Sequence, residues 1–245
     1  MPIRILINGA QGKMGQETVK AVSEHSKDFT LVAKTGKSDD LTKSIRDHKP
    51  QIVIDFTHAD AAFKNTQTII EAGAHPVIGT SGLLKNQIAL LQKRCSELKL
   101  GGIIVPNFSL GAVLMMKCAK EIARHFSIVE IIEAHHAGKL DSPSGTAMRT
   151  AELITSSRTE EPLQPAHTKE TLTGARGAKY GNIPIHSIRL PGIIANQEVI
   201  FGAPGETLSI KHTTIDRQCF MPGVLLACKK VMGLDKLVYG LEELM

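Results

Sequence analysis

The sequence is poor in aromatic residues and in clustered charge, and both absences exclude classes of protein. Phenylalanine, tyrosine and tryptophan make up 4% of the 245 residues, and tryptophan is absent. Proteins that bind single-stranded nucleic acid stack bases on surface aromatic rings, so this composition argues against a nucleic-acid partner. The chain also has no long block of like charges of the kind that forms a nucleic-acid-binding tail.

Metal motifs, redox motifs and membrane-spanning runs are missing as well. The four cysteines, Cys95, Cys118, Cys219 and Cys228, form no Cys-x-x-Cys pair. We expect reduced structural thiols and no bound metal. No apolar run approaches the roughly 18 residues that span a bilayer, and the N-terminus lacks a signal-peptide pattern. These absences predict a cytoplasmic protein without a membrane partner.

The remaining composition is that of an ordinary globular protein. Hydrophobic residues make up 42% and charged residues 22%, enough to bury a sizeable core. The length fits one large domain or two small ones. A net charge of +5 is compatible with a solvated surface, and it also suits anionic ligands such as nucleotides and dicarboxylates.

In the first half of the chain, short apolar runs rich in branched residues alternate with helical stretches. Strands are predicted at 3–7, 29–33, 51–56, 76–79 and 102–105, and helices around 14–22 and over 61–72 and 86–98. This alternation predicts a parallel sheet with helices on both faces.

After Pro106 the pattern changes. Helices are predicted at 112–126 and 222–232, a turn plus a helix at 142–157, and a long polar loop at 158–182. Strands are predicted at 128–134, 183–190, 197–201 and 207–212. Their hairpin-like spacing predicts a mostly antiparallel or mixed sheet, so the fold class is α/β with a smaller α+β part.

A glycine-rich turn, residues 9–15, follows the first strand and opens the first helix. The strict dinucleotide fingerprint has glycine at position 10, where this chain has Ala10. Gly12 would let the backbone approach a pyrophosphate, and Gly15 would let helix and strand pack closely. Lys13 would add a cation. A purely structural turn is the alternative, but the position between strand and helix favours phosphate binding.

The end of the second strand lacks the acidic residue that usually binds the ribose of NAD. Lys34 and Lys37 stand there instead and could bind a 2′-phosphate, although both could equally be solvated surface residues. We therefore expect NADPH to be used at least as well as NADH.

Polar turns at 55–58, 79–82 and 106–109 also end strands, where a nicotinamide ribose would lie. Ordinary turn chemistry is the alternative for each of them.

The densest chemistry lies in residues 133–147. Ser142 is a plausible N-cap with Pro143 as the first helical residue, so that the helix start at 144–146 would bind a ligand carboxylate. His135 and Lys139 are candidate acids for the proton that must follow hydride delivery to a conjugated imine.

Three other interpretations of this segment are weaker. A metal site would need a third ligand beside His135 and His136, and none has a recognised spacing. One of the two histidines is expected to be a core residue unless the strand has ended before them, because neighbours on a strand point to opposite faces. Ser144 does not lie in a nucleophile-elbow sequence, which argues against hydrolysis.

The run Glu-x-His-His-x-x-Lys-x-Asp-x-Pro-Ser-Gly-Thr-Ala at 133–147 resembles the signature of 4-hydroxy-tetrahydrodipicolinate reductases, also called dihydrodipicolinate reductases. The motifs at 9–15, 55–57, 79–82 and 106–109 resemble that family's other motifs in the same order. The resemblance covers essentially the whole chain.

The resemblance implies NAD(P)H-dependent reduction of 4-hydroxy-tetrahydrodipicolinate to tetrahydrodipicolinate, in diaminopimelate and lysine synthesis. It implies a Rossmann-like dinucleotide-binding domain at 1–107 and 217–245, and a smaller mixed-sheet domain at 108–216 that binds substrate and builds a homotetramer.

By resemblance, His135 and Lys139 are the proton-transfer residues, and His136, Gly145 and Thr146 contact substrate; the helix start adds Ser144 to the expected substrate contacts. The cofactor residues implied are Gly9, Ala10, Gln11, Gly12, Lys13, Met14, Lys37, Gly79, Thr80, Ser81, Val105, Pro106, Asn107 and Phe108.

The chain departs from the family pattern at three positions. Gly36 stands where many members have Glu or Asp, which argues against a strong NADH preference. Ser81 and Ser142 are milder changes. Two other functions account for less of the sequence. A semialdehyde dehydrogenase would need a cysteine at a strand end, but Cys118 falls in a predicted helix. A non-catalytic nucleotide sensor would leave the segment 133–147 without a purpose.

Overall fold

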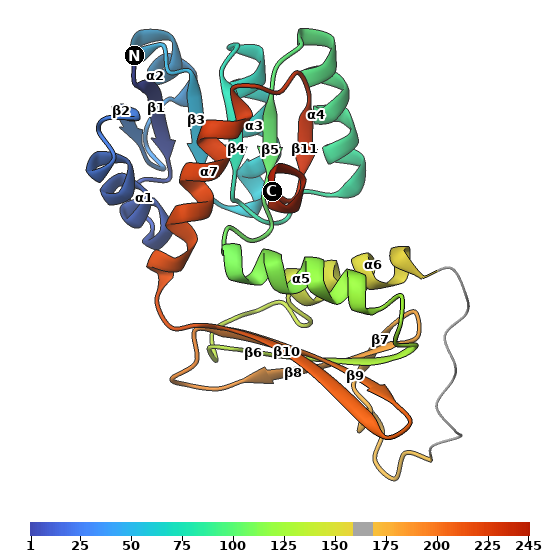
Figure 1. Ribbon diagram of the computed structural model, residues 1–245. Helices are drawn as coiled ribbons and strands as arrows, with labels where there is room; N and C mark the ends of the chain where they lie inside the picture. Colours follow the sequence, from blue (N-terminus) through green and yellow to red (C-terminus); the bar gives the residue numbers. More distant parts are fainter. Residues whose placement is uncertain (159–168) are drawn as a thin grey trace. The chain divides into compact units, whose positions relative to one another are not determined.

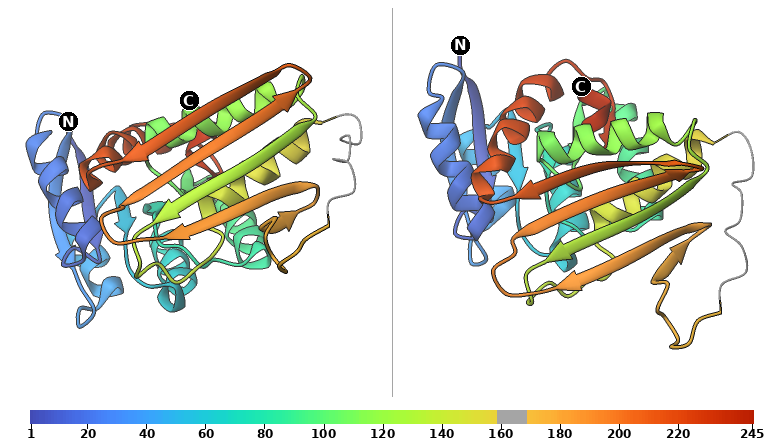
Figure 2. Two further views of the ribbon diagram at one scale, coloured as in Figure 1. Left: turned by 90° about the horizontal axis from the view of Figure 1, so that it is seen from below. Right: turned by 60° about the horizontal axis from the view of Figure 1, so that its bottom comes forward.

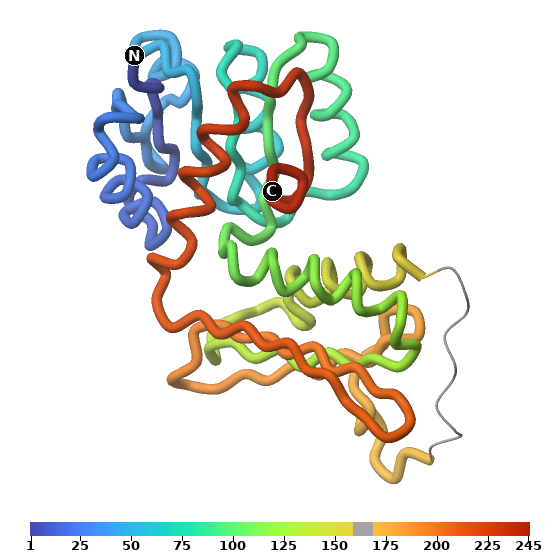
Figure 3. Tube along the Cα trace, viewed as in Figure 1, coloured from blue at the N-terminus to red at the C-terminus, as the bar shows by residue number. Residues whose placement is uncertain are grey.

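The structure is a computed structural model that describes residues 1–158 and 169–245. The chain forms two compact units. Unit 1 comprises Met1–Leu110 and Arg217–Met245, and unit 2 comprises Gly111–Asp216. The trace in Figure 3 starts and ends in unit 1, so its C-terminal part returns to the unit in which the chain began.

Unit 1 is built on a six-stranded sheet in the order β11-β5-β4-β3-β1-β2. The strands are β1 (Ile3–Asn8), β2 (Phe29–Thr35), β3 (Ile52–Asp55), β4 (His75–Ile78), β5 (Gly102–Ile104) and β11 (Leu237–Tyr239). All neighbouring pairs are parallel. The central strands are apolar and buried along their length, as strands covered on both faces must be.

Helices cover both faces of this sheet (Figure 1). Helices α1 (Lys13–Glu24) and α7 (Met221–Val231) pack against each other on one face. Helices α2 (Leu41–His48), α3 (Ala59–Glu71) and α4 (Lys85–Leu98) line the other. The predicted Rossmann-like arrangement is confirmed. None of the described helices is long and apolar enough to cross a membrane.

Unit 2 is built on a five-stranded sheet in the order β10-β9-β6-β8-β7. The strands are β6 (Ile128–His135), β7 (Ala178–Tyr180), β8 (Ile183–Arg189), β9 (Ala195–Ala203) and β10 (Glu206–Thr214). Only the β6–β8 pair is parallel, so the sheet is mixed, as predicted. Helices α5 (Leu110–Ile122) and α6 (Gly145–Ser157) lie on one face, and no described element of unit 2 covers the other (Figure 2).

Four elements differ from the sequence prediction. Helix α2 was missed because its segment is polar and buries only Ile45, although Asp40 caps it by accepting a hydrogen bond from the Lys43 amide at 3.0 Å. Strand β11 was also missed, and the predicted loop at 158–182 is wrong at β7. Both strands have three residues, too few for an alternation pattern. Residues 159–168 of that loop lie outside the described residues. Helix α5 ends at Ile122 and not at residue 126.

Candidate active site

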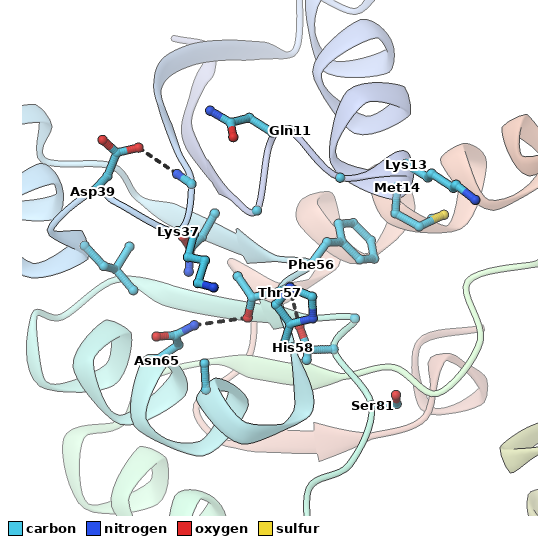
Figure 4. A pocket seen from close by; sticks show the side chains of 18 residues that line it. Gln11, Lys13, Met14, Lys37, Asp39, Phe56, Thr57, His58, Asn65 and Ser81 are labelled. Carbon is cyan, nitrogen blue, oxygen red and sulfur yellow. Dashed lines mark hydrogen bonds between the residues drawn. The ribbon is translucent and has the colours of Figure 1, made fainter. Parts of the chain in front are cut away.

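A pocket of about 630 Å³ opens at the carboxyl ends of the unit 1 strands (Figure 4). Strand register places Asn8 beside Asp55 and Asp55 beside Ile78, so the following turns meet at one edge of the sheet. Residues from the glycine-rich turn, the end of β2 and the ends of β3 and β4 line the pocket. They are Asn8, Gly9, Gln11, Gly12, Lys13, Met14, Gly36, Lys37, Asp39, Leu41, Phe56, Thr57, His58, Ala61, Asn65, Gly79, Thr80 and Ser81.

The glycine-rich turn has the close packing that phosphate binding requires. Gly9 has a φ of +81°, and a Cβ there would lie 2.2 Å from the Phe56 carbonyl oxygen. A Cβ on Gly15 would lie 2.1 Å from the Gly9 carbonyl oxygen. Gly12 is the N-cap of α1 and brings no side chain to the helix start. The first amides of α1 therefore have no intrahelical partner and can bind an anion.

A buried carboxylate organises the floor of this pocket. Asp55 is fully buried and accepts hydrogen bonds from Asn8 Nδ2 at 2.8 Å and Asn65 Nδ2 at 2.9 Å. The hydroxyls of Thr57 and Thr80 donate to its other oxygen at 2.7 and 2.5 Å. These bonds join the ends of three neighbouring strands, so the polar turns at 55–58 and 79–82 hold one another in place.

Two phenylalanines lie where the pocket meets the core. The rings of Phe56 and Phe108 contact edge to face with centroids 5.6 Å apart. A Cβ on Gly79 would lie 2.1 Å from the Phe56 ring, so only glycine fits there. Phe108, Val105 and Ala10 are buried, Asn107 is half-buried and Pro106 is exposed, and none of these predicted cofactor residues lines the pocket.

The β2 end of the pocket carries opposite charges. The Asp39 carboxylate accepts a hydrogen bond from the Gly36 amide at 2.7 Å, and both Asp39 and Lys37 line the pocket. In Figure 4 they lie on one side and Lys13 on the other. The sequence prediction considered only the lysines; it missed this carboxylate because Asp39 follows the strand end by four residues.

The second cluster of predicted residues lies in unit 2 and centres on Glu133. Its side chain is fully buried on β6. The guanidinium of Arg189 donates to both carboxylate oxygens at 2.9 Å, and His135 Nδ1 lies 2.5 Å from Oε2. Burial opposes ionisation, but hydrogen bonds from His135, Arg189 and Ser187 lower the pKa of Glu133 to about 2.

Lys139 lies in the loop that follows β6. Its ammonium donates to the Asp141 carboxylate at 2.7 Å. Although partial burial opposes it, this hydrogen bond lowers the pKa of Asp141. The Asp141 carbonyl oxygen accepts from Arg189 Nη2 at 2.7 Å, so the same arginine supports both predicted proton-transfer residues.

The start of α6 corrects the sequence prediction. Ser144, and not Ser142, is the N-cap: its backbone is extended, and its hydroxyl accepts from the Ala147 amide at 3.2 Å. The Ser144 amide donates to Glu133 Oε1 at 3.2 Å, and the residue is buried. Gly145 is the first helical residue and is exposed, while Thr146 is half-buried.

The two histidines have different surroundings. Strand β6 ends at His135, which is mostly buried on the Glu133 carboxylate, and His136 is exposed in the following turn. Neither is a core residue. Within the described part of the chain, no group of three His, Cys, Asp or Glu side chains is arranged to hold a metal ion.

Comparison with known proteins decides the family. The model for the N-terminus of dihydrodipicolinate reductase matches residues 3–108, and the model for its C-terminus matches residues 111–245. The chain belongs to the dihydrodipicolinate reductase family. Proteins named 4-hydroxy-tetrahydrodipicolinate reductase from Legionella pneumophila and Coxiella burnetii are 54% and 52% identical over the whole of both chains. A solved dipicolinate-bound dihydrodipicolinate reductase from Paenisporosarcina sp. TG-14 is 40% identical, with a TM-score of 0.87 and complete coverage of both chains.

For this member of the dihydrodipicolinate reductase family, sequence reasoning missed two organising residues. Glu133 was noted only as the first letter of the signature run, and Arg189 received no role. The signal was weak, because an arginine 56 residues from its partner along the chain shows no pattern until β6 and β8 are paired.

Proposed function

We propose that this chain catalyses NAD(P)H-dependent reduction of 4-hydroxy-tetrahydrodipicolinate to tetrahydrodipicolinate, a step toward diaminopimelate and lysine. The observation that carries the proposal is the cluster of His135 and Lys139 beside the N-terminus of α6, in a chain that full-length reductases of this name match from end to end. The proposal includes a cytoplasmic location and no nucleic-acid or membrane partner.

The pocket of unit 1 fits a dinucleotide. Its volume, the tight glycine packing at Gly9 and Gly15 and the uncapped start of α1 suit a pyrophosphate. Lys37, which lines the pocket, would contact a 2′-phosphate, while Gly79, Thr80 and Ser81 would contact the remainder of the cofactor. When bound, the nicotinamide supplies the hydride.

The substrate is a cyclic dicarboxylate, and unit 2 offers groups for its anions. The amides of Gly145 and Thr146 open α6, and His136 lies in the exposed turn after β6. The dipicolinate-bound relative carries a ligand of the same dicarboxylate class. Ser144 supports this binding indirectly, because its own amide and hydroxyl are engaged with Glu133 and Ala147.

The reaction adds one hydride and one proton, and the substrate hydroxyl leaves as water. His135 and Lys139 are the groups that hold and transfer protons in this scheme. Arg189 supports both, through the Glu133 carboxylate and through the Asp141 carbonyl. A histidine or lysine acid in such a position contributes roughly 10²–10⁴-fold to a rate.

The proposed assembly is a homotetramer built through the sheet of unit 2. Strand register places Ile128, Ile132, Ile188 and Ile200 on the face that no described element of unit 2 covers. Ile128 and Ile188 are exposed to 38% and 40%. Exposed apolar side chains gathered on one face favour association. The proposed domain boundaries are 1–107 with 217–245 for the dinucleotide and 108–216 for substrate binding and assembly.

The test is oxidation of NADPH and NADH followed optically, with substrate generated freshly in the cuvette. Turnover that depends on both substrate and cofactor supports the proposal. Dinucleotide binding without turnover would instead favour the non-catalytic nucleotide sensor. Light scattering tests the tetramer separately.

A further inference from the structure

We infer that Glu133 is a positioning residue: its carboxylate holds the His135 imidazole with hydrogen on Nδ1, leaving Nε2 for proton transfer, and the same carboxylate anchors the start of α6. The inference rests on the proposed function, because it assigns a purpose to His135 within that reaction.

Five donors converge on this one side chain, and one of them is the side chain of Ser187. His135 Nδ1 lies 2.5 Å from Oε2, Arg189 donates once to each oxygen, and the Ser144 amide donates to Oε1. The side chain has no exposed surface. An ionised carboxylate accepts hydrogen bonds and donates none. The imidazole nitrogen that faces it must therefore carry the hydrogen, and in a neutral imidazole that leaves Nε2 as the acceptor.

The charge state of Glu133 supports this arrangement. The paired guanidinium of Arg189 and the other donors keep the carboxylate ionised despite complete burial, with a pKa of about 2. A carboxyl group that stayed protonated would donate one hydrogen bond and would no longer specify the histidine tautomer. The half-buried arginine thus keeps the carboxylate ionised, and able to specify the tautomer of the neutral ring, over the pH range in which an enzyme works.

One carboxylate also connects three elements of the site. His135 ends β6, Arg189 ends β8, and Ser144 caps α6. A shift of Glu133 would move the proton-transfer histidine and the carboxylate-binding helix start together. A second polar bond, from Gln197 Nε2 to Thr150 Oγ1 at 2.7 Å, holds α6 to β9, which neighbours β6.

The same strand offers a matched control. Glu130 also accepts from a histidine, His186 at 2.8 Å, and from an arginine, Arg176. It lies three positions before Glu133, so its side chain is on the opposite face of the sheet, and 30% of it is exposed. Losing its charge perturbs a similar cluster without touching His135.

The first experiment needs no activity, and it uses a variant only to assign a signal. Long-range ¹H–¹⁵N spectra of wild-type protein, with His135 assigned by its loss in His135→Ala, report the tautomer of the neutral ring. Hydrogen on Nδ1 supports the inference, and hydrogen on Nε2 overturns it. Because the readout is spectroscopic, it stands even if the proposed reaction fails, and absent turnover of the wild type would refute only the proposed function.

The second experiment is a double-mutant cycle on kcat. Glutamine at position 133 keeps one acceptor and introduces a donor, so the donors can no longer all be satisfied. We expect Glu133→Gln to lower kcat roughly 10- to 100-fold, as losses of an orienting partner do. Direct titration should show unchanged NADPH affinity, and Glu130→Gln should leave kcat within about threefold.

In the His135→Ala background, Glu133→Gln should lower kcat by no more than about threefold further, because the histidine through which Glu133 acts is absent. An equal loss in both backgrounds would show that Glu133 is merely structural. Light scattering on each variant verifies that assembly is unchanged, and if Glu133→Gln does not fold, the tautomer measurement alone decides.

Discussion

Acidification should remove stability from this protein through Glu133 in an amount that can be worked out. The pKa of this carboxyl is about 2 in the folded protein against an ordinary value of 4.5: burial raises it, but the hydrogen bonds from His135 and Arg189 together lower it further. A depressed folded pKa contributes stability that is present above the unfolded value and is lost as the pH falls toward the folded value. The sensitive window therefore runs from about pH 5 down to about pH 2.

The full contribution is about 3 kcal/mol, since 2.5 units separate the two pKa values and each unit is worth about 1.4 kcal/mol. Above about pH 5.5 nearly all of it is present, and at about pH 3 less than half of it remains. Between these two pH values Glu133 alone should cost the protein about 2 kcal/mol of unfolding free energy.

Other carboxyls titrate over the same range, so the measurement must be a difference. Urea unfolding of wild type and Glu133→Gln, at one protein concentration and several pH values, isolates this side chain. Glutamine resembles the protonated acid, so the two proteins should differ most near neutral pH and converge on acidification. A difference that stays constant between about pH 6 and about pH 3 would refute the ionised, hydrogen-bonded carboxylate.

Three further predictions concern the reaction. Lys139→Ala should lower turnover by about two or more orders of magnitude in the substrate assay, as loss of a general acid does, with the melting temperature nearly unchanged. Asp39→Asn should raise the NADPH-to-NADH ratio of kcat/KM about two- to fivefold and Lys37→Ala should lower it similarly, since both residues are exposed and such charges contribute about 0.2–1 kcal/mol. Gly145→Ala and Thr146→Val should weaken substrate binding, measured by titration, more than NADPH binding, because we propose that the start of α6 binds a substrate carboxylate.

Each of these has an outcome that contradicts it. Turnover of Lys139→Ala within about threefold of wild type would exclude the acid role, given the size of general-acid effects. A cofactor ratio that moves in neither Asp39→Asn nor Lys37→Ala would exclude both residues from the ribose site. Equal losses of substrate and cofactor affinity in Gly145→Ala would show that the start of α6 is not the anion site of the substrate. A Cβ at Gly145 meets no protein atom within 4 Å, so the substitution itself causes no clash within the protein.

Much of the fold follows from local patterns. The buried strands of unit 1 are continuous branched apolar runs, and each ends at a polar or glycine turn, so their parallel order is readable from the chain. What escaped prediction depends on tertiary pairing. Helix α2 has too few apolar residues, Leu41 and Ile45, to be recognised from the sequence, and β7 and β11 exist because β8 and β5 pair with them.

The start of α6 shows how a local rule fails when a distant group intervenes. Ser142 followed by Pro143 matches the cap-then-proline pattern of a helix start. Ser144 takes the role instead, because Glu133 accepts its amide hydrogen and leaves its hydroxyl to bond the Ala147 amide. Both serines were visible in the sequence. The position of the Glu133 carboxylate, which determines which serine caps α6, was not.

The cofactor end shows a related limit, and the structure explains the departure at Gly36. The Gln11 side chain lies over this glycine, and a Cβ on Gly36 would come within 3.2 Å of it. An acidic side chain at position 36 would therefore compete with Gln11 for space. The chain places its carboxylate three residues later, where Asp39 is fixed by the Gly36 amide and lines the same pocket as Lys37. A ribose hydroxyl favours the carboxylate and a 2′-phosphate favours the lysine, so we expect the balance between these two exposed charges to set the cofactor preference.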